Sequence, residues 1–176
     1  MNGIWDEYAG NVAFVGLAIA LWAHLSIWFS RQLIGHTRLV FGLVTGATSI
    51  GSIMLAFEAS QGVLVDLRHA PLALAAMFGG PVAATVASAM AITFRIWVGG
   101  AAMLDGIAAV IMVAVLGLAI NASTRNRQPR LSDLAAVTLG LAVVLISAMM
   151  LLPTLAAVNL MKLAGFELVV LNCTAV

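Results

Sequence analysis

The chain has 176 residues, of which 63% are hydrophobic and only 9% charged, and its mean hydropathy is +1.12. A soluble domain carries roughly 25% charged residues, and a chain of this length has too little interior to hide so much apolar surface from water. The apolar stretches run for about 17 to 22 residues without strict alternation, which favours membrane helices over barrel strands. The composition predicts an all-α, polytopic transmembrane helix bundle.

Several function classes find no support in the residues. A net charge of +1 without a basic stripe gives no sign of nucleic-acid binding. The single Cys173 excludes an intramolecular disulfide and a Cys-based metal cluster. The start of the chain carries Asp6 and Glu7 and no Lys or Arg, unlike a signal peptide. No phosphate loop, nucleophile elbow or H-E-x-x-H pair occurs, so we assign no catalytic residues and expect no metal and no cofactor.

Polar loops and glycine turns divide the chain into about six spans plus a partial last helix. Turns are predicted at Gly79-Gly80-Pro81 and at Gly99-Gly100. In chain order the predicted segments are Gly10–Phe29, Leu39–Phe57, Val63–Phe78, Val82–Val98, Ala101–Asn121, Leu134–Leu152 and the partial Phe166–Val176.

Small residues four apart predict close contacts between these helices. Gly42 and Gly46 have this spacing, and so do Ala83, Ala87 and Ala91. Such spacing lets membrane helices approach each other closely. We expect it to serve packing within the chain.

Arginine placement predicts the orientation. Two short loops carry most of the arginines, and with the segments above they fall on the same side: Arg31 and Arg38 in the first, and Arg125, Arg127 and Arg130 in the second. Short loops rich in Lys and Arg stay in the cytoplasm. We therefore expect the N-terminus outside.

The last apolar run is too short to span. As a helix, Phe166–Val176 would rise only ~16 Å, about half of the hydrocarbon thickness. A re-entrant segment is one explanation. We favour the other, that residues 1–176 are a single transmembrane domain truncated within its last helix, before a cytoplasmic output domain.

Four charged residues are predicted to share one layer near the outer side. Counted from Gly80, Asp66 and Arg95 both lie about 20 Å along antiparallel helices. Counted from the turn at Gly99-Gly100, Arg95 and Asp105 lie within about one helical turn on either side. With Arg68, these residues form two positive and two negative charges that can neutralise one another.

A broken helix is predicted beside this layer. Proline suits the first turn of a helix and disfavours a helical residue before it, so the third segment should begin at Pro71 and leave Asp66–Ala70 unwound. Unwound backbone at membrane depth is tolerated where it lines a cavity. Free amides at this helix start, with the nearby arginines, would suit a small anionic or zwitterionic ligand.

The candidate ligand-binding residues are Asp66, Arg68, His69, Arg95, Asp105 and Glu58. Ionisable residues inside a membrane are functional candidates by default. Two simpler explanations stay open: Arg95 and Asp105 can snorkel to the outer boundary, and Asp66 and Arg95 can form a purely structural ion pair.

The ordered set Asp66-Leu67-Arg68, Pro71, Gly79-Gly80-Pro81, Arg95 and Gly99-Gly100 resembles the five-transmembrane receptor family of the LytS/YhcK type. Asn172 also matches a family position. This family is the membrane input module of bacterial histidine kinases and diguanylate cyclases. The resemblance implies a sensor domain in the bacterial inner membrane that detects a small ligand or a change in the membrane at its outer side. We also expect a homodimer formed through the output domain. The resemblance favours a diguanylate cyclase over a histidine kinase as that output.

Two other functions stay open. The family is structurally related to the substrate-binding subunits of energy-coupling-factor transporters, so a solute-binding transport subunit is the alternative. It predicts co-purification with ATPase subunits. A packing subunit without a ligand is the third reading, and it predicts a dry, fully ion-paired charged layer.

Overall fold

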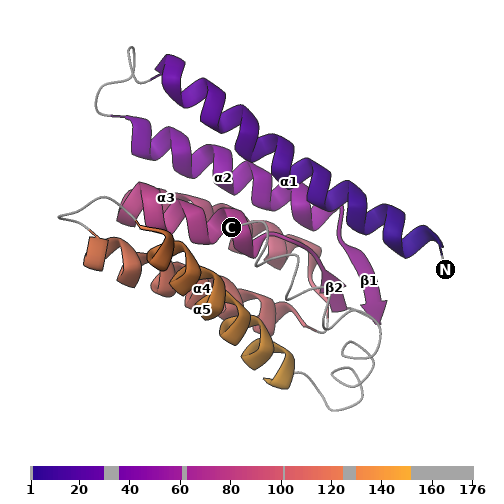
Figure 1. The fold of residues 1–176 in the computed structure, drawn as a ribbon. Coiled ribbons are helices and arrows are strands. Elements are labelled where there is room, and N and C mark those ends of the chain that lie inside the picture. The colour runs from indigo at the N-terminus through magenta and orange to yellow at the C-terminus, as the bar shows by residue number, and fades with distance from the viewer. Residues whose placement is uncertain (1, 30–35, 61–62, 101, 125–129, 152–176) are drawn as a thin grey trace.

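The computed structural model describes residues 2–29, 36–60, 63–100, 102–124 and 130–151. Five helices and one short hairpin make up this part (Figure 1). The elements are α1 (Asn2–Phe29), α2 (Thr37–Met54), β1 (Phe57–Ser60), β2 (Val63–Val65), α3 (His69–Val98), α4 (Met103–Thr124) and α5 (Leu131–Leu151). The predicted segment Phe166–Val176 lies outside the described residues. The predicted truncation within the last helix concerns the same residues and stays a prediction.

Helix α3 is a helical hairpin rather than one straight rod. At Gly80 the backbone leaves the helical region, with φ 69° and ψ −159°, values that glycine adopts far more readily than other residues. Arg68 and Arg95, at opposite ends of α3, both approach Gly106 of α4. A straight helix would hold these two residues about 40 Å apart. The chain therefore folds back at Gly80, which confirms the predicted turn.

Small residues pack the second arm of α3 against α2. A side chain added at Gly42 would lie 2.9 Å from the Cα of Ala83, and one at Gly46 would lie 3.2 Å from the Cα of Ala87. The closest contacts of these helices thus run through backbone that only small residues leave uncovered. The predicted role of this spacing in packing within the chain is confirmed.

The turn of α3 lies at the same end of the bundle as the starts of α2 and α5. Arg38, Gly80 and Asn121 line one cavity, and Phe78 and Leu134 line a neighbouring one. The starts of α2 and α5, the end of α4 and the turn of α3 therefore lie together at this end. We call it the basic end, because Arg38 and Arg130 are exposed there.

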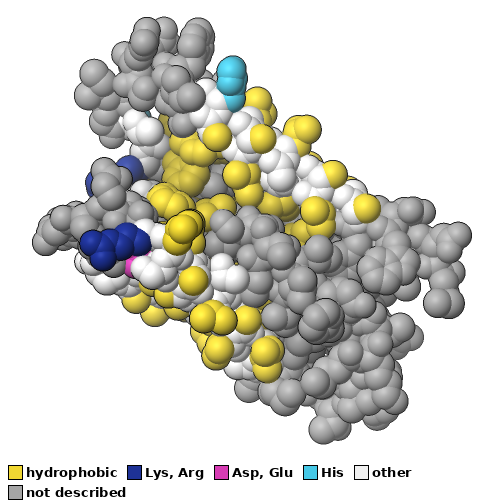
Figure 2. Space-filling model, viewed as in Figure 1, with side chains coloured by type: hydrophobic (Ala, Val, Ile, Leu, Met, Phe, Trp, Pro, Cys, Tyr) yellow, Lys and Arg dark blue, Asp and Glu magenta, His cyan; other side chains and the backbone are white. Residues whose placement is uncertain are grey.

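Four helices in the described part are long and apolar enough to cross a membrane: α2, α3, α4 and the Leu131–Ala148 part of α5. The expected count of six spans is not supported. The apolar part of α1 is only Ala9–His24, and the first arm of α3, 69–79, rises only ~16 Å. Large apolar side chains such as Trp97 and Leu139 are exposed. Hydrophobic side chains lie along the face drawn in Figure 2. A lipid solvent accounts for that exterior.

The predicted all-α fold has one small departure. β1 and β2 pair antiparallel, with Phe57 opposite Val65 and Glu58 opposite Leu64. The sequence predicts a helix through Phe57 and another from Val63. Helix α2 ends at Met54, and the β-branched Val63 and Val65 favour a strand. The hairpin leads the chain into the charged turn before α3.

Candidate functional site at the charged end of the bundle

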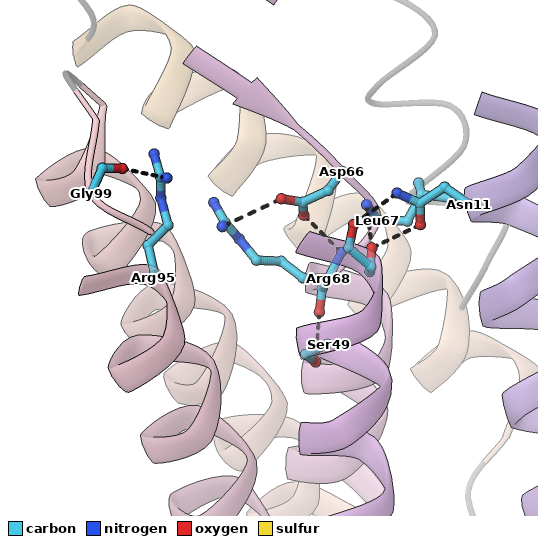
Figure 3. A network of polar contacts seen from close by, with 8 residues as sticks. Asn11, Ser49, Asp66, Leu67, Arg68, Arg95 and Gly99 are labelled. Atoms are coloured by element: carbon cyan, nitrogen blue, oxygen red, sulfur yellow. Dashed lines mark hydrogen bonds and ion pairs between the residues drawn. The ribbon is translucent and has the colours of Figure 1, made fainter. Parts of the chain in front are cut away.

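The turn before α3 is built by Asp66 and Arg68. One carboxylate oxygen of Asp66 accepts a hydrogen bond from the Arg68 backbone N–H at 3.0 Å, and the other lies 3.3 Å from Arg68 Nη1 (Figure 3). Both side chains are buried, at 1% and 5% exposure. A buried carboxylate and guanidinium are tolerated together because each offsets part of the other's desolvation cost. We call the end that holds this turn the charged end.

Helix α2 and helix α1 hold this turn in place. The Ser52 hydroxyl accepts a hydrogen bond from the Leu67 N–H at 2.9 Å and donates one to Asn11 Oδ1 at 2.8 Å. Asn11 in turn donates to the Ser52 carbonyl at 3.1 Å, and the Ser49 hydroxyl lies 3.4 Å from the Arg68 carbonyl. These contacts join three elements distant in sequence into one buried network (Figure 3).

Arg95 reaches the same place from the second arm of α3. Its Nη1 donates to the Gly99 carbonyl at 2.7 Å, and the residue is only 1% exposed. A side chain added at Gly106 would lie 2.9 Å from Arg68 Nη2 and 3.2 Å from Arg95 Nε. Because Gly106 has no side chain, both guanidiniums fit against the start of α4.

Several buried nitrogens in this layer lack hydrogen-bond partners among the described residues. They are Arg68 Nε, Arg68 Nη1 (which keeps its ion-pair contact with Asp66), Arg95 Nε and both ring nitrogens of His69. Unpaired buried donors of charged groups are costly. Two guanidiniums about 6 Å or less apart also repel each other. The layer thus contains hydrogen-bond donors without acceptors among the described residues, and two guanidiniums concentrate positive charge near Gly106.

The structure brings three of the six predicted site residues into one cluster: Asp66, Arg68 and Arg95. His69 is buried directly after Arg68, in the first turn of α3. The predicted shared depth of these residues is confirmed by the approach of both arginines to Gly106.

Other parts of the expectation need correction. Asp105 is partly exposed in the first turn of α4, and within the described residues it forms no ion pair with Arg68 or Arg95. The ion pair seen among the described residues joins Arg68 to Asp66 and does not include Asp105. Helix α3 begins at His69, two residues before Pro71, so the unwound stretch ends at Arg68. The Glu58 side chain lies outside the described part of the structure.

Sequence reasoning missed Asn11, Ser49, Ser52 and Gly106. The three polar residues interrupt long apolar runs, and this is the one signal that could have singled them out. Their partners are 15 to 41 residues away in sequence, so their roles follow only from the fold. Among the residues searched, no group of three His, Cys, Asp or Glu side chains could hold a metal ion.

Fold and site together define a polytopic membrane helix bundle with a buried, arginine-rich cluster near one end. The chain belongs to the 5TMR-LYT family: the family model described as the 5TMR of 5TMR-LYT matches residues 25–176. This family is a membrane sensor domain of signalling proteins, and the match confirms the resemblance to the LytS/YhcK type. No curated protein and no solved structure matches the chain.

Proposed function

We propose that this sensor domain detects a small anion, such as a carboxylate or phosphate, at its charged end. One observation carries the proposal: two buried guanidiniums meet at Gly106, and each keeps a hydrogen-bond donor without a partner in the described structure. Guanidinium groups bind planar carboxylates and phosphates through two parallel hydrogen bonds. Asp66 lies beside Nη1 of Arg68, which leaves the Nε edge of that guanidinium for a ligand.

The surroundings of the cluster support coupling between binding and a conformational change. An anion there would offset the repulsion between Arg68, directly before the first arm of α3, and Arg95 on the second arm. Drawing the two guanidiniums together would change how the arms pack against α4. A ligand shifts an equilibrium between two conformations only by its difference in affinity for them. An anion binds more tightly to the conformation with Arg68 and Arg95 close together than to one in which they are apart.

We further propose that the charged end faces outward and the basic end faces the cytoplasm of a bacterial inner membrane, with the N-terminus outside. The exposed Arg38 and Arg130 at the basic end support this orientation. The regulated output is then a cytoplasmic diguanylate cyclase or, as the second choice, a histidine kinase. A two-fold dimer through the output domain suits either enzyme.

The proposal is tested on the full-length protein in membrane vesicles. Cyclase or kinase output is measured with and without acetate or inorganic phosphate, for the native protein and for Arg95→Gln and Arg130→Gln. We expect the Arg95→Gln protein to lose its response at least tenfold in sensitivity, while Arg130→Gln, an exposed arginine at the other end, responds normally. An unchanged response in an Arg95→Gln protein that inserts into the membrane would refute the proposed site.

The transport-subunit alternative uses the same anion site but a different readout. It predicts uptake of the anion into vesicles that also contain ATPase subunits, with no change in a signalling output. Binding that depends on Arg95, found together with uptake, would decide for this alternative.

A further inference from the structure

The basic end of the bundle contains two neighbouring cavities that the charged cluster does not use. One, of about 570 Å³, lies between α1, α2 and the first arm of α3. The other, of about 600 Å³, lies under the Gly80 turn, against the end of α4. Arg38, Phe78 and Gly79 line both. Each cavity falls in the size range of small-molecule sites.

The first cavity offers an apolar surface. Its walls include the stacked rings of Trp22 and Phe41, whose centroids lie 5.0 Å apart, together with Leu74. Thr45 and Thr48 also line it, but their hydroxyls donate to carbonyls of their own helix at 2.8 and 2.9 Å. Because those donors are occupied, the wall suits a hydrocarbon chain better than a polar solute.

The second cavity is more polar. Gly80 and Asn121 line it, and the Asn121 amide donates to the Met77 carbonyl at 2.6 Å. Arg38 stands where the two cavities meet, and it is exposed and forms no ion pair within the described residues. On the face drawn in Figure 2, hydrophobic side chains lie in a hollow near arginine side chains.

We infer that these joined cavities bind one anionic phospholipid of the surrounding bilayer. An acyl chain lies in the apolar cavity, the phosphate lies at Arg38, and the polar headgroup enters the cavity under Gly80. Charge complementarity selects an anionic lipid over a zwitterionic one, because Arg38 supplies one positive charge without a partner in the described chain. The first cavity is lined by α2 and α3, two of the candidate membrane-spanning helices, and by the shorter apolar part of α1, so its walls belong to the apolar part of the bundle. This site is independent of the anion site at Arg68 and Arg95.

The site gives the domain a way to respond to lipid composition. Phe78 and Gly79 lie directly before the turn that joins the arms of α3, and both line the two cavities. A lipid seated there contacts the turn itself and so favours one packing of the two arms. Loss of anionic lipid would remove that preference.

The test uses the chain in nanodiscs of phosphatidylcholine, with or without one-fifth phosphatidylglycerol of the same acyl chains. Native mass spectrometry counts retained phosphatidylglycerol for the native chain, Arg38→Gln and the matched Arg130→Gln. We expect one retained molecule per chain, about fivefold weaker retention in Arg38→Gln, and unchanged retention in Arg130→Gln. Equal losses in both variants would show only general attraction to the basic end and would overturn the inference, as would equal retention of phosphatidylcholine.

Two further experiments distinguish the contribution of the headgroup phosphate from that of the acyl chains. Glycerol 3-phosphate, which has the headgroup phosphate but no acyl chains, should neither bind nor displace the retained lipid. Ala18→Trp fills the apolar cavity from α1 and should lower retention even with Arg38 present. Displacement by glycerol 3-phosphate would reassign the cavity to a soluble phosphate and overturn the lipid assignment. A folded Ala18→Trp chain that retains phosphatidylglycerol fully would also contradict it.

Discussion

The two ends of the bundle place their arginines in opposite environments, buried at one end and exposed at the other. At the charged end, Arg68 and Arg95 are 4% and 1% exposed and are held by a carboxylate and a backbone carbonyl. At the basic end, Arg38 and Arg130 are exposed. A charge inside a membrane is costly unless protein groups replace its water, whereas a charge at the boundary needs no such support. The buried pair is therefore a candidate for ligand binding, and the exposed pair for orientation, with Arg38 also a candidate for lipid contact.

The ends also differ in how the backbone is fixed. At the charged end, hydroxyls and an amide from α1 and α2 hold the turn before α3. At the basic end, the Gly80 turn relies on its own backbone conformation and on one hydrogen bond from Asn121 to Met77. Substitutions at the two ends should therefore have unequal effects on stability.

The largest expected difference is between Arg68→Ala and Arg38→Ala. Removing Arg68 takes away the ion-pair partner of a buried carboxylate and should cost about 3–5 kcal/mol. Arg38→Ala should change stability by no more than about 0.5 kcal/mol in lipid-free micelles. Unfolding by sodium dodecyl sulfate in mixed micelles measures both. Equal losses would remove the distinction between buried and exposed arginines.

Gly80→Ala tests the turn of α3. Alanine at φ 69° and ψ −159° is strained and should cost about 1–3 kcal/mol. Gly16→Ala is the matched control, because a side chain added there meets nothing within 4 Å and alanine is the better helix former by about 1 kcal/mol. The same unfolding assay should give opposite signs. A Gly80→Ala chain as stable as the native one would contradict the fold-back of α3 at Gly80.

Ser52→Ala tests the network at the charged end. It leaves the buried Leu67 N–H without its acceptor, which should cost about 1–3 kcal/mol. Ser147→Ala removes an exposed hydroxyl that bonds only its own helix, and it should stay within about 0.5 kcal/mol of the native chain. If Ser52→Ala and Ser147→Ala lower the free energy of unfolding equally, the turn before α3 is not anchored through α2.

Asn121→Leu has the smallest expected effect. It removes the hydrogen bond to the Met77 carbonyl, and such bonds inside membrane proteins contribute about 0.6 kcal/mol on average. Unfolding in mixed micelles, averaged over repeated titrations, resolves a change of this size. A loss as large as that of Ser52→Ala would show that the basic end is held as firmly as the charged end.

Much of the fold could be predicted from hydropathy and glycine turns. The long apolar runs mark α2, α4 and α5, and Gly79-Gly80-Pro81 marks the turn of α3. The shared depth of Asp66 and Arg95 followed from counting residues along two antiparallel segments from Gly80, since helical rise is nearly constant. The span count did not follow, because the first arm of α3 is short and a strand pair replaces the helix before it.

The details of the site could not be predicted for a different reason. Whether Asp105 turns toward the arginines depends on the rotation of α4 about its axis, which residue counting does not give. The contacts of Ser52 with Asn11 and Leu67 depend on how three elements pack. The spacing of residues in the sequence predicts how far along a helix a side chain lies, but it does not predict toward which neighbour that side chain points.

The most direct test of the central claim is anion binding by the purified chain. Its unfolding temperature is measured while acetate or inorganic phosphate is titrated, for the native chain, Arg95→Gln and Arg130→Gln, with sodium chloride holding ionic strength constant. We predict a saturable rise in unfolding temperature that disappears in Arg95→Gln and persists in Arg130→Gln. No rise with either anion, or an equal rise in Arg95→Gln, would contradict an anion site at the charged end.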